Sequence, residues 1–346
     1  MQIVFKTIYL KKLFPLRISR GVRDGQSNLY VSITENGHTG WGESSPGTSE
    51  GASGPEEVQG QLAAFLKEHQ NLSSVQITYD AALDFGLAPC ALAALDIALW
   101  DLKAKQAQMP LYQLLGFPKP KHPTSITLGI MDPAEAKERL PLILENNGIR
   151  TLKVKLGSND GIEADKLMYQ EVLEYHKKYP ISIRVDANGG WSLEDAKHMM
   201  QWLAERHCEY VEQPLVEGQE KDLEVLYKNR PLPIYVDESC RMATNIPAWA
   251  HSVDGVNMKL MKCGGITGAL RIIATAKAFK LKTMIGCMGE SSISIAAGAA
   301  VSGALDHIDL DSHLNLNPDP CEGAPLIHGI TMPLDVPGHG GQFKKT

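Results

Sequence analysis

Three carboxylates stand at the ends of three short β-like runs in the middle of the chain. Asp186 lies in "RVDAN", Glu212 in "YVEQP" and Asp237 in "YVDES". Three carboxylates brought together would repel one another and take up protons unless a cation lay among them. All-oxygen ligands, with water completing the coordination sphere, suit Mg²⁺. Each residue alone would indicate no more than a helix cap, but three in consecutive runs predict a metal site with Mg²⁺ as the cofactor.

Lysines in two further β-like runs have the chemistry of bases beside such a metal. Lys153 and Lys155 alternate in "TLKVKLG" and so lie on one face of their strand, and Lys259 lies in "VNMKLMK". A free lysine has a pKa of about 10.4. A second ammonium and a metal charge lower this pKa toward ~7–8, so we expect Lys153 to lower the pKa of Lys155. Two bases on opposite faces of a carbon acid, with a cation on its carbonyl oxygen, would invert its configuration.

The elements that must position these residues alternate between strand and helix from about residue 124 onward. Helix-like stretches lie between the strands, for example at 192–207, where Ser192 is the expected N-cap, and at 265–280. Eight β-rich runs begin at residues 124, 151, 182, 210, 234, 255, 282 and 307. This spacing is typical of a (β/α) barrel, in which catalytic residues come from the carboxyl ends of the strands. An open doubly wound sheet is the alternative topology, but its GxGxxG turn is missing from the sequence.

The first third of the chain has a different pattern. "LYVSITENGHTGWGESS" predicts two antiparallel strands joined by a turn at residues 35–37, and residues 89–106 predict a helix with an apolar stripe. Strands followed by helices indicate an α+β domain. We therefore expect an α+β capping domain over residues 1–118, a barrel over residues 119–319, and a return of residues 320–346 to the capping domain.

The composition of the chain indicates which partners and which cellular compartment to expect. The 346 residues include 34 Lys and Arg against 40 Asp and Glu, which gives a net charge of −6. An acidic protein is poorly suited to nucleic acid or an anionic membrane, and no apolar run approaches the ~18 residues of a membrane span. The chain start alternates like a strand without a signal-peptide cleavage site, and the six cysteines are scattered as in a reduced protein. We expect a cytoplasmic protein that acts on a small molecule.

Taken in order, these motifs resemble those of the enolase superfamily, in its muconate-lactonizing subgroup. The resemblance spans nearly the whole chain and is carried by "GWGESSP", "ALAALDIALWDLKAK", "KVK", "DANGGW", "VEQP", "DES" and "VNMKLMKCGG". It implies a (β/α)7β barrel under an N-terminal α+β domain, often in a homo-oligomer. It also implies that Mg²⁺ is bound by the three carboxylates and that Lys155 and Lys259 are the acid/base pair. The mandelate racemase branch would need a histidine on the seventh strand, where "KTMIGCM" has none.

The eighth strand narrows the reaction within this subgroup. "IDLDSH" puts Asp309 and Asp311 on one strand face, where they would bind the ammonium group of a dipeptide. An acylated amino acid or a muconate would instead meet two unpaired negative charges. We therefore expect a dipeptide epimerase that inverts the α-carbon of the C-terminal residue. The alternatives are N-succinylamino acid racemase, o-succinylbenzoate synthase and a muconate-type cycloisomerase, and the two aspartates could also simply cap the turn after them.

Loops around the expected barrel mouth suggest the side chain of the substrate. Arg20 lies in "ISRGVRDGQSN", which resembles the mobile lid of the family, and could grip the side-chain carboxylate of a glutamyl residue. We therefore expect L-Ala-L-Glu and L-Ala-D-Glu, fragments of murein peptide, as the leading substrate pair. Thr127, in the first barrel strand, is placed among the substrate-binding residues. The sequence assigns no role to Glu290 in "CMGESS".

Overall fold

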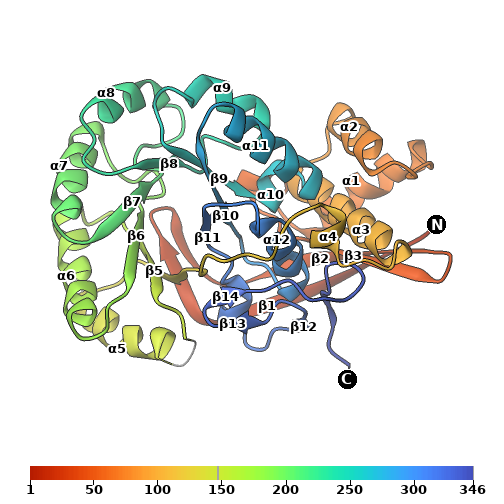
Figure 1. Ribbon diagram of the computed structural model, residues 1–346, viewed down its shortest axis with the longest axis horizontal. Helices are drawn as coiled ribbons and strands as arrows, with labels where there is room; N and C mark the ends of the chain where they lie inside the picture. Colours follow the sequence, from red (N-terminus) through yellow and green to blue (C-terminus); the bar gives the residue numbers. More distant parts are fainter. Residues whose placement is uncertain (146–147, 346) are drawn as a thin grey trace.

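A computed structural model of the protein describes residues 1–145 and 148–345 (Figure 1). Its N-terminal part is an antiparallel sheet in the order β1-β2-β3, followed by helices. The strands are β1 (Gln2–Ile18), β2 (Gly21–Glu35) and β3 (His38–Ser44), and the helices are η1 (Thr48–Glu50), α1 (Pro55–Glu68), α2 (Val75–Phe85), α3 (Pro89–Gln106) and α4 (Leu111–Leu114). The predicted turn joins β2 to β3. Asn36 and Gly37 have φ angles of 50° and 77°, as a tight two-residue hairpin turn requires.

Helix α3 occupies the predicted range but is more deeply buried than an amphipathic helix. The sequence suggests one apolar stripe, whereas side chains on nearly every side of α3 are buried. Sheet strand β3 packs closely on this helix because Gly40 and Gly42 have no side chains. A Cβ added at these glycines would lie 2.1 Å from the carbonyl oxygen of Ala98 and 2.0 Å from that of Ala94. Close backbone contact therefore joins the sheet to α3.

The barrel contains eight parallel strands in sequential order, β4 to β11. They are β4 (Ile126–Leu128), β5 (Thr151–Lys155), β6 (Ser182–Asp186), β7 (Cys208–Glu212), β8 (Ile234–Val236), β9 (Gly255–Lys259), β10 (Lys282–Gly286) and β11 (His307–Ile308). Each begins within two residues of its predicted start. The ring closes where Thr124 forms a bridge with Ile308 and the amide of Ser125 donates to the Ile308 carbonyl over 3.0 Å. This confirms the predicted (β/α)7β fold class and excludes the open sheet.

Helices lie around the outside of the barrel strands, and the later ones also pack against the capping domain (Figure 1). They are α5 (Pro133–Leu144), α6 (Ile162–Lys178), α7 (Leu193–Ala204), η2 (Glu220–Asp222), α8 (Leu223–Lys228), η3 (Ala243–Asn245), α9 (Ile246–Trp249), α10 (Leu260–Cys263), α11 (Ile266–Ala278), α12 (Ser292–Ser302) and η4 (Ser312–Asn315). The predicted N-cap of α7 is present, because Ser192 Oγ accepts a hydrogen bond from the Asp195 amide over 3.1 Å.

The β1–β2 hairpin extends from the capping domain to the barrel, and Figure 1 shows it in red running toward β5 and β6. Its tip is hydrogen-bonded to barrel loops. The Ile130 amide donates to the Arg17 carbonyl over 2.8 Å, and Ser19 Oγ donates to the Asn188 carbonyl over 3.1 Å. The hairpin therefore covers the carboxyl ends of the barrel strands.

The last part of the chain contacts the capping domain. It forms β12 (Cys321–Glu322), β13 (Leu326–Ile327), β14 (Ile330–Thr331) and β15 (Gln342–Phe343), paired as β12 with β15 and β13 with β14. His339 Nε2 lies 2.8 Å from the Trp41 carbonyl, and the Phe343 ring packs on the Tyr30 and Trp41 rings. These are contacts that the predicted return requires, while the domain limits themselves stay a prediction.

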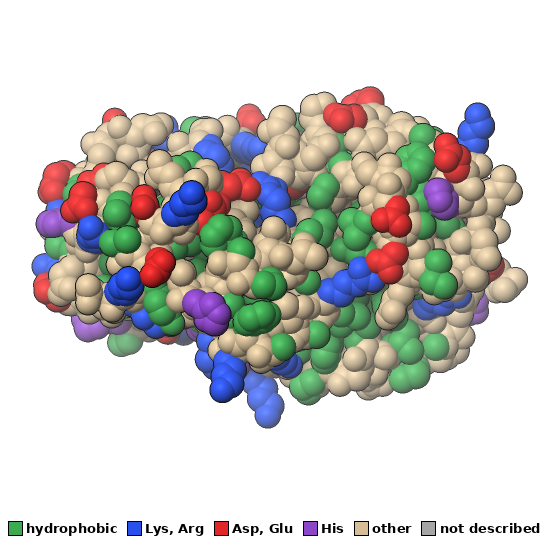
Figure 2. Space-filling view, turned by 90° about the horizontal axis from the view of Figure 1, so that it is seen from above, with side chains coloured by type: hydrophobic (Ala, Val, Ile, Leu, Met, Phe, Trp, Pro, Cys, Tyr) green, Lys and Arg blue, Asp and Glu red, His purple; other side chains and the backbone are tan. Residues whose placement is uncertain are grey.

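The surface carries charges of both signs. Figure 2 shows acidic and basic side chains interspersed over one face, with apolar side chains between them. Among the described residues, no helix is both long enough and apolar enough to cross a bilayer.

Candidate active site

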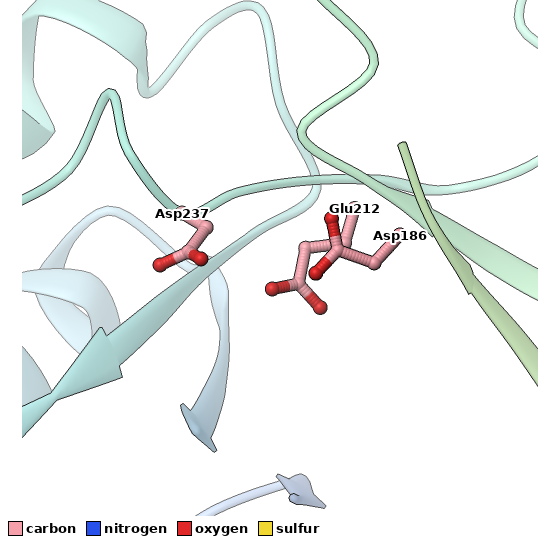
Figure 3. Close-up of side chains that lie close together, drawn as sticks. All are labelled: Asp186, Glu212 and Asp237. Carbon is pink, nitrogen blue, oxygen red and sulfur yellow. The ribbon is translucent and has the colours of Figure 1, made fainter. Parts of the chain in front are cut away.

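The three predicted metal ligands converge inside the barrel. Asp186 and Glu212 are the last residues of β6 and β7, and Asp237 follows β8 directly. All three side chains are buried, and one carboxylate oxygen from each lies within 4.8 Å of the others. Figure 3 shows the three carboxylates turned toward a common space from neighbouring strands. Parallel pairing produces this cluster, since Asp186 and Glu212 lie directly opposite each other in the β6–β7 register.

The contacts of these carboxylates fit a hard divalent cation. Asp186 Oδ1 accepts from the Asn188 amide over 2.8 Å, and Glu212 Oε1 accepts from Asn257 Nδ2 over 2.7 Å. Within the described chain, Glu212 Oε2 and Asp237 Oδ2 accept no hydrogen bond, although each lies 2.8 Å from a lysine ammonium. Buried carboxylate oxygens with unused acceptor capacity are the donor set that Mg²⁺ takes in proteins.

The two predicted bases lie on either side of this carboxylate cluster. Lys155 Nζ is 2.6 Å from Asp186 Oδ2, and Lys259 Nζ is 2.8 Å from Asp237 Oδ2. Their strands, β5 and β9, flank the three strands that carry the carboxylates. Burial lowers the pKa of Lys259, but the attraction of Asp237 outweighs burial and raises that pKa above its ordinary value. A cation bound to Asp237 would weaken this attraction.

Lys153 has a different environment from the one that the sequence suggests. Its ammonium lies 3.0 Å from Asp186, 2.8 Å from Glu212 and 2.9 Å from Asp309, and its side chain is 1% exposed. Burial lowers the pKa of Lys153, but the surrounding carboxylates outweigh burial and raise it well above its ordinary value. Its positive charge is largely compensated within the barrel. The tuning of Lys155 by Lys153 therefore stays a prediction.

The two aspartates of the eighth strand have different surroundings, although the sequence treats them as a pair. Asp309 contacts the Lys153 ammonium and accepts a hydrogen bond from Ser125 Oγ over 2.5 Å. Asp311 accepts hydrogen bonds from the Thr127 amide, over 2.7 Å, from the Thr127 side chain, and from the Cys287 thiol, over 3.6 Å. No Lys or Arg of the described residues lies within ion-pair distance of Asp311. Asp311 is therefore the carboxylate of this pair that lacks a cation.

A cavity of about 400 Å³ lies between the barrel mouth and the β1–β2 hairpin. Asp309, Asp311 and the two bases line its barrel side. Its remaining wall combines charged side chains such as Glu50 and Arg241 with apolar ones, which include Leu16, Ile18, Leu128, Met131 and Met288. This volume is within the range of small-molecule sites.

Arg20 and Thr127 also line this cavity. The Arg20 guanidinium is already paired: Nη2 lies 2.7 Å from Glu238 Oε1, and Nη1 donates to the Asn188 carbonyl over 3.0 Å. To bind a substrate carboxylate, Arg20 would have to share or exchange these partners. Thr127 contacts Asp311 through its backbone amide, which donates over 2.7 Å, and through its side chain.

Several polar residues of the site escape the sequence-based predictions. Lys262, in the short helix α10, is buried against the Asp237 carboxylate and donates to the Asp237 carbonyl over 2.6 Å. Asn257 orients Glu212 from β9. The spacing in the sequence could have pointed to both residues. Asn257 lies two residues before Lys259 on the same strand face, and Lys262 lies one helical turn after Lys259.

Glu290 lies in the loop after β10, between Met288 and α12. Its side chain is buried, and Oε1 accepts from the Met288 amide over 2.6 Å. Burial raises the pKa of Glu290 to about 8. The neighbouring loop is tied to the capping domain, because Asn28 Nδ2 donates to the Gly289 carbonyl over 2.7 Å. These contacts hold the loop after β10 at the edge of the cavity.

Comparison with known proteins decides the family. A model of the "Mandelate racemase / muconate lactonizing enzyme, N-terminal domain" matches residues 3–116, and a model of the "Enolase C-terminal domain-like" family matches residues 135–346. The chain belongs to this branch of the enolase superfamily. The resemblance suggested by the motifs is thereby confirmed.

Individual relatives cover essentially the whole chain. A hydrophobic dipeptide epimerase of the Flavobacteria bacterium strain MS024-2A is 59% identical over 100% of this chain and 99% of its own. A protein of the same description from Roseobacter litoralis is also 59% identical, over 99% of this chain and 98% of its own. Among solved structures, the dipeptide epimerase of Enterococcus faecalis V583, complexed with Mg and L-Leu-L-Tyr, is 32% identical. It has a TM-score of 0.89 and covers 98% of each chain.

Proposed function

We propose that this protein is a Mg²⁺-dependent dipeptide epimerase that inverts the α-carbon of the C-terminal residue. The protein is an isomerase, in keeping with its epimerase relatives. The observation that carries the finer proposal is the position of Lys155 and Lys259 on opposite sides of the buried carboxylate cluster. Two amines so placed can reach opposite faces of one carbon atom.

The chemistry of the proposal divides among named residues. Asp186, Glu212 and Asp237 would hold Mg²⁺, which supplies positive charge for the carboxylate of the substrate as its α-proton leaves. One lysine of the pair removes the α-proton, and the other returns a proton from the opposite side. This requires one lysine to be neutral while the other is protonated. Lys153 and Lys262 contact the carboxylates and hold them in place.

Asp311 supports a substrate that carries a free ammonium group. It lines the cavity and has no cationic partner among the described residues, so a bound ammonium would complete its pairing. N-Succinylamino acids, which have no ammonium group, would leave it unpaired. Burial, and next the repulsion of Asp309, raises the pKa of Asp311. Because binding requires the ionised carboxylate, KM for a dipeptide should rise as pH falls through this raised pKa.

The apolar part of the cavity wall and the descriptions of two relatives favour an apolar C-terminal residue. Leu16, Ile18 and Met131 face the cavity, and the relatives at 59% identity are described as hydrophobic dipeptide epimerases. L-Ala-L-Leu is therefore our first substrate candidate. L-Ala-L-Glu remains the second, because Arg20 also lines the cavity and could accept the glutamyl carboxylate in exchange for Glu238.

Isotope exchange tests the reaction and the substrate together. The purified protein with Mg²⁺ in D₂O should incorporate deuterium at the C-terminal α-carbon of L-Ala-L-Leu and form the L,D-epimer, as measured by NMR. Asp311→Asn should raise KM for this dipeptide at least about tenfold and remove its pH dependence. Exchange in N-succinyl amino acids with none in any dipeptide would favour the racemase alternative. Turnover of a muconate or an o-succinylbenzoate precursor would favour the cycloisomerase or the synthase.

A further inference from the structure

A lysine occupies an inward-facing position of β1 where its neighbours are apolar. Alternate residues of this strand, Leu10, Lys12 and Phe14, face the interior, whereas Lys11 points to solvent. Lys12 is only 9% exposed and lines the same cavity as the site described above. An apolar residue would satisfy the strand pattern, so the amine at this position needs an explanation.

The Lys12 ammonium has no partner within the part of the chain that the structure describes. No hydrogen bond and no ion pair joins it to another residue, and burial lowers its pKa. Asp311 attracts it from beyond ion-pair distance, and Arg23, another cation lining the cavity, repels it. A buried ammonium without a counter-ion is costly, and the cost falls when a ligand supplies an anion.

Hydrogen bonds fix Lys12 at the Asp311 end of the cavity. Phe14 and Asn315 exchange two hydrogen bonds of 2.9 Å, and the Asn317 amide donates to the Lys11 carbonyl over 2.9 Å. Lys12 itself forms a β-bridge with Leu316. These contacts tie β1 to the segment that follows Asp311, so Lys12 and Asp311 lie in one connected wall.

We propose that Lys12 recognises an acidic side chain on the N-terminal residue of the substrate dipeptide, an inference that rests on the proposed function. Asp311 would take the ammonium group of that residue, and Lys12 would take its side-chain carboxylate. The two opposite charges of an aspartyl residue are a few bonds apart, and Lys12 and Asp311, which would face them, line the same cavity. Each protein charge then meets its opposite, and Arg23 adds favourable potential.

The most direct test of this proposal compares two dipeptides of nearly the same shape. L-Asp-L-Leu and L-Asn-L-Leu differ by a charge, and the wild-type enzyme should prefer the aspartyl dipeptide in kcat/KM by about tenfold or more. Lys12→Met should abolish this preference, and Lys12→Arg should keep it. Lys11→Met, which removes the exposed neighbouring charge, should leave the preference unchanged and so controls for net charge.

The outcomes separate this inference from the proposed function. A wild-type enzyme that epimerises L-Ala-L-Leu but handles the aspartyl and asparaginyl dipeptides alike would overturn the role of Lys12 without using any variant. A preference for the aspartyl dipeptide that survives in a folded Lys12→Met protein would do the same. Failure to exchange any dipeptide would count against the proposed function instead.

Discussion

Lys155 and Lys259 are nearly equivalent in chemistry but contact different carboxylates at the two ends of the cluster. In the proposed reaction each lysine would serve one stereoisomer of the substrate. In a two-base reaction the lysine that faces the α-proton removes it, and exchange with solvent can follow even when no proton arrives from the other side. Epimerisation, in contrast, needs both amines.

Replacing one lysine at a time should separate exchange from epimerisation. Lys155→Ala and Lys259→Ala should each lower the epimerisation rate by about 10²–10⁴-fold. Each variant should still exchange the α-proton of one epimer with D₂O, and the two variants should retain opposite epimers. NMR of both epimers in D₂O measures this.

Lys277→Ala provides the matched control, because Lys277 is an exposed lysine of α11 that does not line the cavity. This variant should keep both epimerisation and exchange. If either active-site variant epimerised at the wild-type rate, or if both retained exchange of the same epimer, the two-base assignment would be wrong.

At the scale of elements, α3 is joined to the barrel through a buried carboxylate. Asp96 accepts hydrogen bonds from the Thr267 amide over 2.9 Å and from Thr267 Oγ1 over 2.5 Å, at the start of α11. Burial raises the pKa of Asp96 from 3.8 to about 7. A carboxyl group whose pKa is higher in the folded state stabilises the fold at low pH and loses that contribution as pH rises toward the raised pKa.

Asp96→Asn should therefore change how stability depends on pH. Between about pH 4 and pH 7 the wild-type protein should lose up to about 1.4 kcal/mol per pH unit through this group. The variant has no such loss, so its melting temperature should rise relative to that of the wild type over this interval. Thermal melts of both proteins at several pH values measure the difference. A difference that stays constant with pH would show that Asp96 does not titrate in this way.

The contact between β3 and α3 gives a second element-scale prediction. Gly42→Ala would place a Cβ 2.0 Å from the Ala94 carbonyl oxygen, so the strand or the helix must shift. We expect a loss of about 1–3 kcal/mol of stability, seen as a lower melting temperature.

Gly60→Ala is the corresponding control in the same domain. Gly60 is exposed within α1, and nothing lies within 4 Å of an added Cβ. This variant should be as stable as the wild type or more stable by about 0.5–1 kcal/mol. Equal stability of the two variants would mean that the sheet and α3 are not in close backbone contact.

At the scale of the whole molecule, the proposed metal site joins three barrel strands, so metal binding should stabilise the fold. Mg²⁺ at one hundred times its Kd would add about 2.7 kcal/mol, which corresponds to several degrees in Tm. EDTA should abolish turnover, and added Mg²⁺ should restore it.

A ligand variant makes this test specific to the site. Asp186→Asn should lose the Mg²⁺-dependent rise in Tm, whereas Glu194→Gln, at an exposed position of α7, should keep it. An equal rise in both variants would place the bound Mg²⁺ elsewhere on the protein.

Much of this architecture follows from local patterns that need no tertiary information. The eight strands could be located because each is a short run of β-forming residues bounded by turns. Asp186, Glu212 and Asp237 could be grouped because carboxyl ends of parallel barrel strands meet at one mouth. The turn at Asn36 and Gly37 likewise depends on the conformations of two residues.

Only the tertiary structure decided which side chains of similar type have partners. Asp309 and Asp311 are equivalent in the sequence, but Lys153 from β5 neutralises the first and not the second. The amphipathic pattern of α3 could not reveal burial on nearly every side, because that depends on packing against elements far away in the chain. The burial of Lys12 without an ionic partner among the described residues depends on contacts with the loop after β11, about three hundred residues later. Alternation and spacing are local properties, whereas charge compensation and burial arise from contacts that only the folded chain brings together.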